Sequence, residues 1–144
     1  MKFPYVKIPL PNRSDYFGSS IIKPIIPVKI SFNGREVIYS ALIDSGADFC
    51  IFDAQIGEYL GVDTKHGIKI GFGGIQERGG AIARLSDVLL TIGGFHFKTA
   101  VGFSSDIAKY GYGILGQKGF FNLFTVKFDY RKSETELKVK LEVN

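Results

Sequence analysis

The chain has 144 residues, of which 45% are hydrophobic and 22% charged, and this is the size and composition of one globular domain that can bury a core. Its net charge of +4 comes from lysines and arginines spread along the chain without a basic run between aromatic residues, which argues against nucleic-acid binding. The sequence lacks a signal-peptide core and an apolar run of membrane-spanning length, so we expect a cytoplasmic protein that does not bind membranes.

The N-terminal part predicts an extended segment followed by a hairpin. Residues 1–20 contain three prolines, and we expect them to form an extended N-terminal arm. The two runs at 25–32 and 35–43 are rich in β-branched and aromatic residues, which is typical of strands. Between them stands Asn33-Gly34, the strongest short signal for a β-hairpin, because both residues tolerate positive φ.

The rest of the chain adds short strands around glycine pairs. A short helix is predicted over residues 54–60, capped by Asp53 and ended by Gly61. Strands are expected at 66–72, 75–85, 87–92, 95–103, 113–116, 125–130 and 135–143, and residues 117–124 could form one or two helical turns. The prediction is a mostly-β fold, a closed or partly open β-barrel of short strands with one or two short helices.

A carboxylate between two apolar runs is the most informative local feature. In residues 41–52, ALIDSGADFCIF, Asp44 follows three apolar residues and a second apolar run begins at Phe49. The burial of an unpaired charge costs several kcal/mol, so an ordinary core strand would not place one there. Asp44 therefore marks either an Asx-type turn on the surface or a site where the fold uses the carboxylate.

Three motifs occur in a meaningful order: LIDSGA at 42–47, IGFGGI at 70–75 and ILG at 114–116. Together they resemble the retropepsin-like aspartic proteases, the family of the retroviral proteases. The resemblance implies the retropepsin-like acid-protease fold. It implies that Asp44 is catalytic, in an active-site loop with Ser45, Gly46, Ala47 and Asp48. It also implies a substrate-binding flap of Phe72, Gly73, Gly74 and Ile75, and a supporting element of Ile114, Leu115, Gly116 and Gln117.

One departure from the family lies in the supporting element. Retroviral members usually carry an arginine that pairs with the acid equivalent to Asp48, and this chain has Gln117 at that position. Gln117 could still hydrogen-bond to Asp48, or Asp48 could pair with Lys118, but the bidentate ion pair is lost.

The number of motifs predicts the assembly. An aspartic protease needs two carboxylates that face one water, and the chain contains a single Asp-Ser-Gly. The resemblance therefore predicts a homodimeric aspartic endopeptidase, with one Asp44 per protomer, that hydrolyses extended peptide or protein substrates without a metal or cofactor. It divides the chain into an arm at 1–20, the retropepsin-like domain at 21–130, and a C-terminal strand at 131–144 that could join the dimer interface. The alternative is a non-catalytic dimeric peptide-binding or assembly module on the same fold.

Other patterns indicate no further chemistry. The G-x-G-x-x-G at 111–116 is not followed by the long helix of a dinucleotide-binding unit. His66 and His96 lie far apart without cysteine or acid clusters, in segments that look like strands, so we expect no metal site. Cys50 has apolar neighbours, and we expect a buried, inert thiol.

Overall fold

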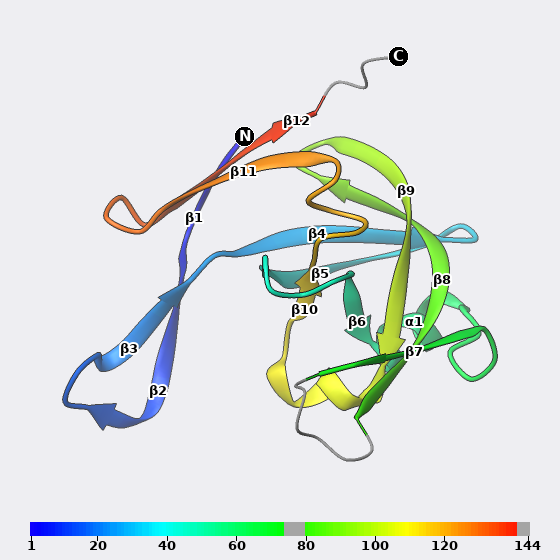
Figure 1. Cartoon of the computed structure of the whole chain (residues 1–144), viewed down its shortest axis with the longest axis horizontal. Coiled ribbons are helices and arrows are strands. Elements are labelled where there is room, and N and C mark those ends of the chain that lie inside the picture. Colours follow the sequence, from blue (N-terminus) through cyan, green and yellow to red (C-terminus); the bar gives the residue numbers. More distant parts are fainter. Residues whose placement is uncertain (74–79, 141–144) are drawn as a thin grey trace.

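The computed structural model describes residues 1–73 and 80–140 (Figure 1). In these residues the strands are β1 (Lys2–Pro4), β2 (Val6–Ser14), β3 (Gly18–Lys23), β4 (Ile25–Phe32), β5 (Arg35–Ile43), β6 (Ile51–Asp53), β7 (Ile68–Phe72), β8 (Ala81–Ile92), β9 (Phe95–Ser104), β10 (Gly113–Leu115), β11 (Phe124–Asp129) and β12 (Glu134–Val139). The helices are α1 (Ala54–Leu60) and a 3₁₀-helix, η1 (Ser105–Tyr110). The prediction of a mostly-β chain with one or two short helices is confirmed.

The main sheet closes into a barrel. Its strand order is β4-β5-β10-β6-β9-β8-β7, and β4 also pairs with β8, so the first six strands form a ring. The ring encloses a core of fully buried side chains, among them Val28, Ile30, Leu90 and Val101. Closure leaves few free strand edges, which protects a β-rich chain from edge-to-edge association. The predicted barrel is therefore present in its closed form.

Local turn chemistry explains the elements that the sequence predicted correctly. Asn33 and Gly34 have φ of 49° and 81°, so the β4–β5 hairpin turns through two residues with positive φ, as primed turns require. The α1 helix begins where the Asp53 carboxylate accepts a hydrogen bond from Gln55 N at 3.0 Å. It ends at Gly61, which adopts the left-handed conformation with φ 84°.

The segment 117–124 contains turns rather than a regular helix, and its last residue, Phe124, begins β11. Phe121 N donates to Gly116 O at 3.2 Å, and Phe124 N donates to Phe120 O at 3.0 Å. Within the first of these turns Gly119 has φ 101°, which interrupts helical geometry. The segment therefore contains hydrogen-bonded turns, but not the one or two turns of helix that the sequence suggested.

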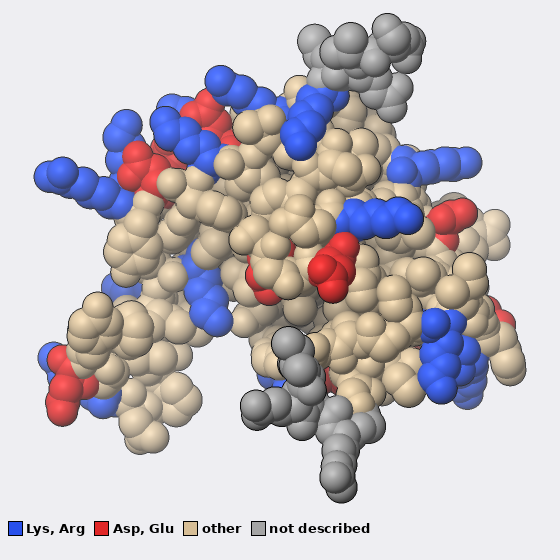
Figure 2. Space-filling view, viewed as in Figure 1, with Lys and Arg blue, Asp and Glu red and all other residues tan. Residues whose placement is uncertain are grey.

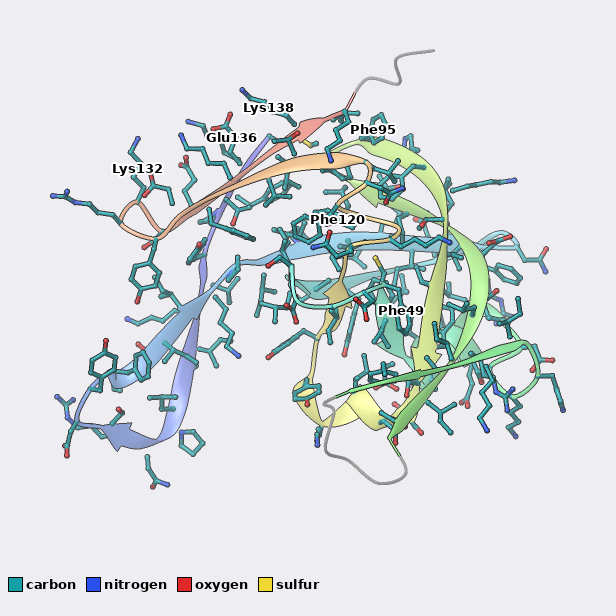
Figure 3. All side chains as sticks on the ribbon, in the orientation of Figure 1. Phe49, Phe95, Phe120, Lys132, Glu136 and Lys138 are labelled. Carbon is teal, nitrogen blue, oxygen red and sulfur yellow. The ribbon has the colours of Figure 1, made fainter. Side chains whose placement is uncertain are left out.

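A second sheet covers one end of the barrel. It has the order β1-β12-β11, with β1 antiparallel to β12. Three aromatic rings fill the space beneath it, because the Phe124 ring lies 5.1 Å from Phe120 and 5.9 Å from Phe95 between centroids. Figure 3 shows Phe120 on the barrel side of β11. Residues 141–143, the end of the predicted last strand, lie outside the described residues.

The N-terminal segment folds back on itself. Strands β2 and β3 pair with each other and form a separate two-stranded sheet. Figure 1 shows this hairpin projecting away from the barrel. The division of the chain at 1–20, 21–130 and 131–144 stays a prediction. None of the helices in the described part of the chain has the length and apolar character that a membrane crossing requires.

Candidate active site

The candidate site begins where β5 ends. Ile43 N donates to Pro24 O at 3.0 Å, and Asp44 N donates to Leu115 O at 3.0 Å. Strand β10 runs parallel to β5 and antiparallel to β6, so it occupies the space between the two strands that residues 44–50 connect (Figure 1). The connecting loop must therefore pass around β10, and this detour places Asp44 at the end of the barrel strand.

The loop itself is an Asx turn. Gly46 N donates to Asp44 Oδ1 at 2.8 Å, and Ala47 N donates to Asp44 O at 3.2 Å. This is the local geometry that the surface-turn interpretation predicted. The tertiary setting goes beyond that interpretation, because the half-buried Asp44 carboxylate also lines a cleft.

The segment after β10 holds the loop from behind. Gln117 N donates to Ala47 O at 2.8 Å, and Lys118 N donates to Asp48 O at 2.9 Å. Gly116 is pressed against the same backbone, since a Cβ there would lie 2.7 Å from Ala47 O. The element expected to thread beside the loop does so, and its glycine permits the close approach.

The Gln117 side chain donates to a backbone oxygen and not to the Asp48 carboxylate. Its Nε2 donates to Ser45 O at 2.7 Å, while the Asp48 side chain is exposed and makes no salt bridge to any described residue. Neither of the two bonds that the sequence left open, from Gln117 or from Lys118 to the Asp48 carboxylate, is present among the described residues. The backbone of Gln117 is already bound to Ala47, and from that position its amide reaches the main chain of the turn.

A cleft of about 500 Å³ opens beside Asp44. The sequence-predicted residues that line it are Asp44, Gly46, Ala47, Asp48, Phe72, Gly73 and Ile114. Ser45, Leu115, Gly116 and Gln117 do not line the cleft and belong to the loop and its support. Gly74 and Ile75, the other expected flap residues, lie outside the described residues.

Sequence reasoning did not assign to the site five further residues that line the cleft: Phe49, Ile51, Gly71, Ile107 and Tyr110. Phe49, labelled in Figure 3, packs edge-to-face against Phe72, with ring centroids 6.1 Å apart. The cleft thus combines apolar side chains with the carboxylates of Asp44 and Asp48.

The 3₁₀-helix η1 brings Ile107 and Tyr110 to the cleft. Its start is capped by Ser104, whose Oγ accepts a hydrogen bond from Asp106 N at 3.1 Å, and its end by Gly111 with φ 73°. A serine before and a glycine after a six-residue segment are capping signals. Those signals could have located the helix, although not its contact with the cleft.

The two histidines lie outside this site. His66 is in the turn region before β7, not in a strand as expected, and its Nδ1 lies 3.1 Å from Asp63 Oδ2. His96 is in β9 and its Nδ1 lies 2.8 Å from Thr91 Oγ1.

Cys50 lies behind the loop and gives a testable prediction. Its side chain is fully buried, Gly116 N donates to its Sγ at 3.4 Å, and burial raises the pKa of the thiol from 9.0 to about 11. At pH 8 the folded protein should therefore react with iodoacetamide at least about 100-fold more slowly than the unfolded chain. The buried thiol also links the free energy of unfolding to pH. Because the pKa of Cys50 is higher in the folded chain than in the unfolded chain, the stability gained by keeping the thiol protonated is fully present below pH 9.0 and is lost as the pH rises toward about 11. Equal alkylation rates with and without denaturant would contradict the buried position.

The described residues thus place the Asp44 carboxylate at the end of a barrel strand, in a cleft that Asp48 also lines. In comparisons with known proteins, no family model matches the sequence and no curated protein matches it. Among solved structures, the chain is similar to EIAV protease complexed with the inhibitor HBY-793, with a TM-score of 0.43 and 24% sequence identity. The match covers 66% of this chain and 82% of that protein. By itself, a likeness at this level assigns neither a family nor an activity.

Proposed function

We propose that the chain is one protomer of a homodimeric aspartic endopeptidase with the retropepsin-like fold. The observation that carries the proposal is the position of Asp44. Its carboxylate is held by Gly46 N at 2.8 Å and lines a cleft of about 500 Å³ at the end of β5. A carboxylate that lines a cleft at the end of a barrel strand is a candidate for acid–base chemistry.

The second carboxylate comes from a second copy of the chain. Two Asp44 side chains meet across a twofold axis, and each protomer presents the same surface to the other. Two carboxylates at such close range cannot both stay ionised, so they hold one proton between them. The pair then contains one base and one acid.

This pair can carry out peptide hydrolysis with a single bound water. The ionised Asp44 takes a proton from the water, whose oxygen forms a bond to the scissile carbonyl carbon. The protonated Asp44 of the other protomer donates its proton to the carbonyl oxygen as negative charge develops there. When the tetrahedral intermediate collapses, the C–N bond breaks, the leaving amine receives the proton of one Asp44, and a hydroxyl of the intermediate returns its proton to the other Asp44.

The surrounding residues orient the pair and the substrate. The bond from Gln117 Nε2 to Ser45 O fixes the outer side of the turn, and Gly46 N fixes one oxygen of Asp44. Phe49 and Ile114 exclude water from the cleft. Phe72 and Gly73 belong to the flap that closes over an extended peptide, and the same role for Gly74 and Ile75 stays a prediction.

The pH dependence of peptide cleavage tests this function. A pair that must be singly protonated should give a bell-shaped kcat/KM profile, since one ionisation activates the site and the next one inactivates it. We expect the optimum on the acidic side of neutrality, measured on a protein substrate or a peptide library with the purified full chain. A transition-state analogue that carries a hydroxyl in place of the attacked carbonyl should inhibit the reaction. A flat profile between about pH 4 and 8 would count against a carboxylate pair.

A further inference from the structure

The β2–β3 hairpin stands apart from the rest of the described structure. Its two strands pair with each other and with no other described strand. Figure 1 shows the hairpin projecting from the barrel, and Figure 2 shows a hollow between it and the body of the molecule. An isolated two-stranded hairpin is at best marginally stable in water. A projecting hairpin of this kind therefore gains stability from a surface to pack against.

The hairpin carries apolar side chains on one face and at its tip. The cross-strand pairs Val6–Lys23 and Ile8–Ile21 place Val6, Ile8 and Ile21 on the same face. At the tip Tyr16 and Phe17 are 88% and 56% exposed, and their rings meet edge-to-face at 4.8 Å. Large exposed aromatic residues at a projecting tip are the kind of side chain that anchors protein interfaces.

Prolines direct how a partner can bind. Pro9 and Pro11 lie in β2 and have no backbone N–H to donate to an added strand. Because two donors are missing from that strand, pairing along the β2 edge is disfavoured. The hairpin then has its apolar face, its tip and the free edge of β3 available for contacts.

The hairpin leaves the barrel beside the candidate active site. Pro24, the residue directly after β3, accepts the hydrogen bond from Ile43 N at 3.0 Å, next to Asp44. Lys23 Nζ donates to Tyr112 Oη at 3.1 Å, close to the Tyr110 that lines the cleft. At roughly 3.3 Å per residue, β3 extends about 20 Å from this point. That reach exceeds the radius of gyration of about 15 Å expected for a domain of this length.

We propose that the β2–β3 hairpin is a dimerisation arm that lies against the body of a second copy of this chain. This inference rests on the proposed function, because a second Asp44 placed opposite the first brings the body of that copy beside the root of the hairpin. Twofold symmetry repeats the contact, so each chain both gives and receives an arm.

Charge favours the same partner. Two copies that meet at Asp44 also bring their exposed Asp48 carboxylates toward the interface. On the same face as Val6 and at the root of the hairpin stands Lys23, a cation of the sign that compensates the carboxylates that the second copy presents.

The test removes the two aromatic rings at the tip. In the full chain, the double variant Tyr16→Ser with Phe17→Ser should raise the dimer dissociation constant at least about tenfold in sedimentation experiments, because exposed aromatic anchors dominate interface energies. Its thermal unfolding should stay close to that of the wild type, since both side chains are exposed in the single chain. Tyr59→Ser is the matched control, because Tyr59 is 59% exposed on α1, and it should leave the dissociation constant unchanged.

A cross-link provides a second measurement that does not depend on the stability of the variant. A benzoylphenylalanine in place of Phe17 should, on illumination, join two chains, and mass spectrometry of mixed isotope-labelled chains should show that the bond is intermolecular. The same group in place of Tyr59 should not join chains.

The outcomes separate this inference from the proposed function. If the wild type is a dimer, the tip variant has the same dissociation constant, and position 17 gives no cross-link, the arm is refuted and the peptidase proposal stands. A dimer that depends on the tip but cleaves no peptide supports the arm and refutes the peptidase. A wild-type chain that stays monomeric at all accessible concentrations overturns both.

Discussion

Asp44→Asn should lower kcat/KM for peptide cleavage by at least about a thousandfold, because the amide can neither accept a proton from water nor share one with the opposite carboxylate. The fold should remain, since an amide oxygen can accept the bond from Gly46 N that Asp44 Oδ1 now accepts. Peptide turnover and thermal unfolding, measured on the same preparation, check both expectations. Asp53→Asn is the matched control, because Asn caps the start of α1 as well as Asp does.

Mixing the variant with wild-type protein tests whether the site is shared. After subunit exchange, a mixed dimer would hold one carboxylate and one amide and should be close to inactive. Activity should then fall with the square of the wild-type fraction, as random pairing of two chains requires. A linear fall would mean that each Asp44 acts alone, and the proposed mechanism would be wrong.

The second large effect is expected at Gly116, and it concerns stability. In Gly116→Ala the new Cβ would lie 2.7 Å from Ala47 O and 2.8 Å from the carbonyl carbon of Phe49, and both of these atoms are backbone. The bond from Gln117 N to Ala47 O holds this backbone in place, so moving it aside would cost free energy. We expect a loss of about 3 kcal/mol in the free energy of unfolding, at the upper end of what overpacking costs.

Denaturant unfolding of Gly116→Ala can be compared with that of Gly71→Ala. At Gly71 the nearest atom to a new Cβ is Ala81 O at 4.0 Å, so that substitution should have little effect on stability. If both variants unfold at the same denaturant concentration, the close packing of Gly116 on the active-site loop does not constrain the fold as we describe.

The sequence by itself determined the features that depend on a few neighbouring residues. The β4–β5 hairpin follows from Asn33 and Gly34, because a primed turn needs two residues that accept positive φ. The bounds of α1 follow from a capping carboxylate at Asp53 and a left-handed glycine at Gly61. The Asx turn at Asp44 belongs to the same class, because the side chain bonds to backbone only two residues away.

Only the tertiary structure decided which distant segments meet. Strand β10 lies between β5 and β6, Ile107 and Tyr110 reach the cleft, and the β2–β3 hairpin stands away from the barrel. Gln117 bonds to the backbone oxygen of Ser45, a partner that the sequence did not suggest, rather than to Asp48. These outcomes depend on how barrel closure and core packing orient whole strands, and such long-range pairing leaves no signature within a short stretch of residues.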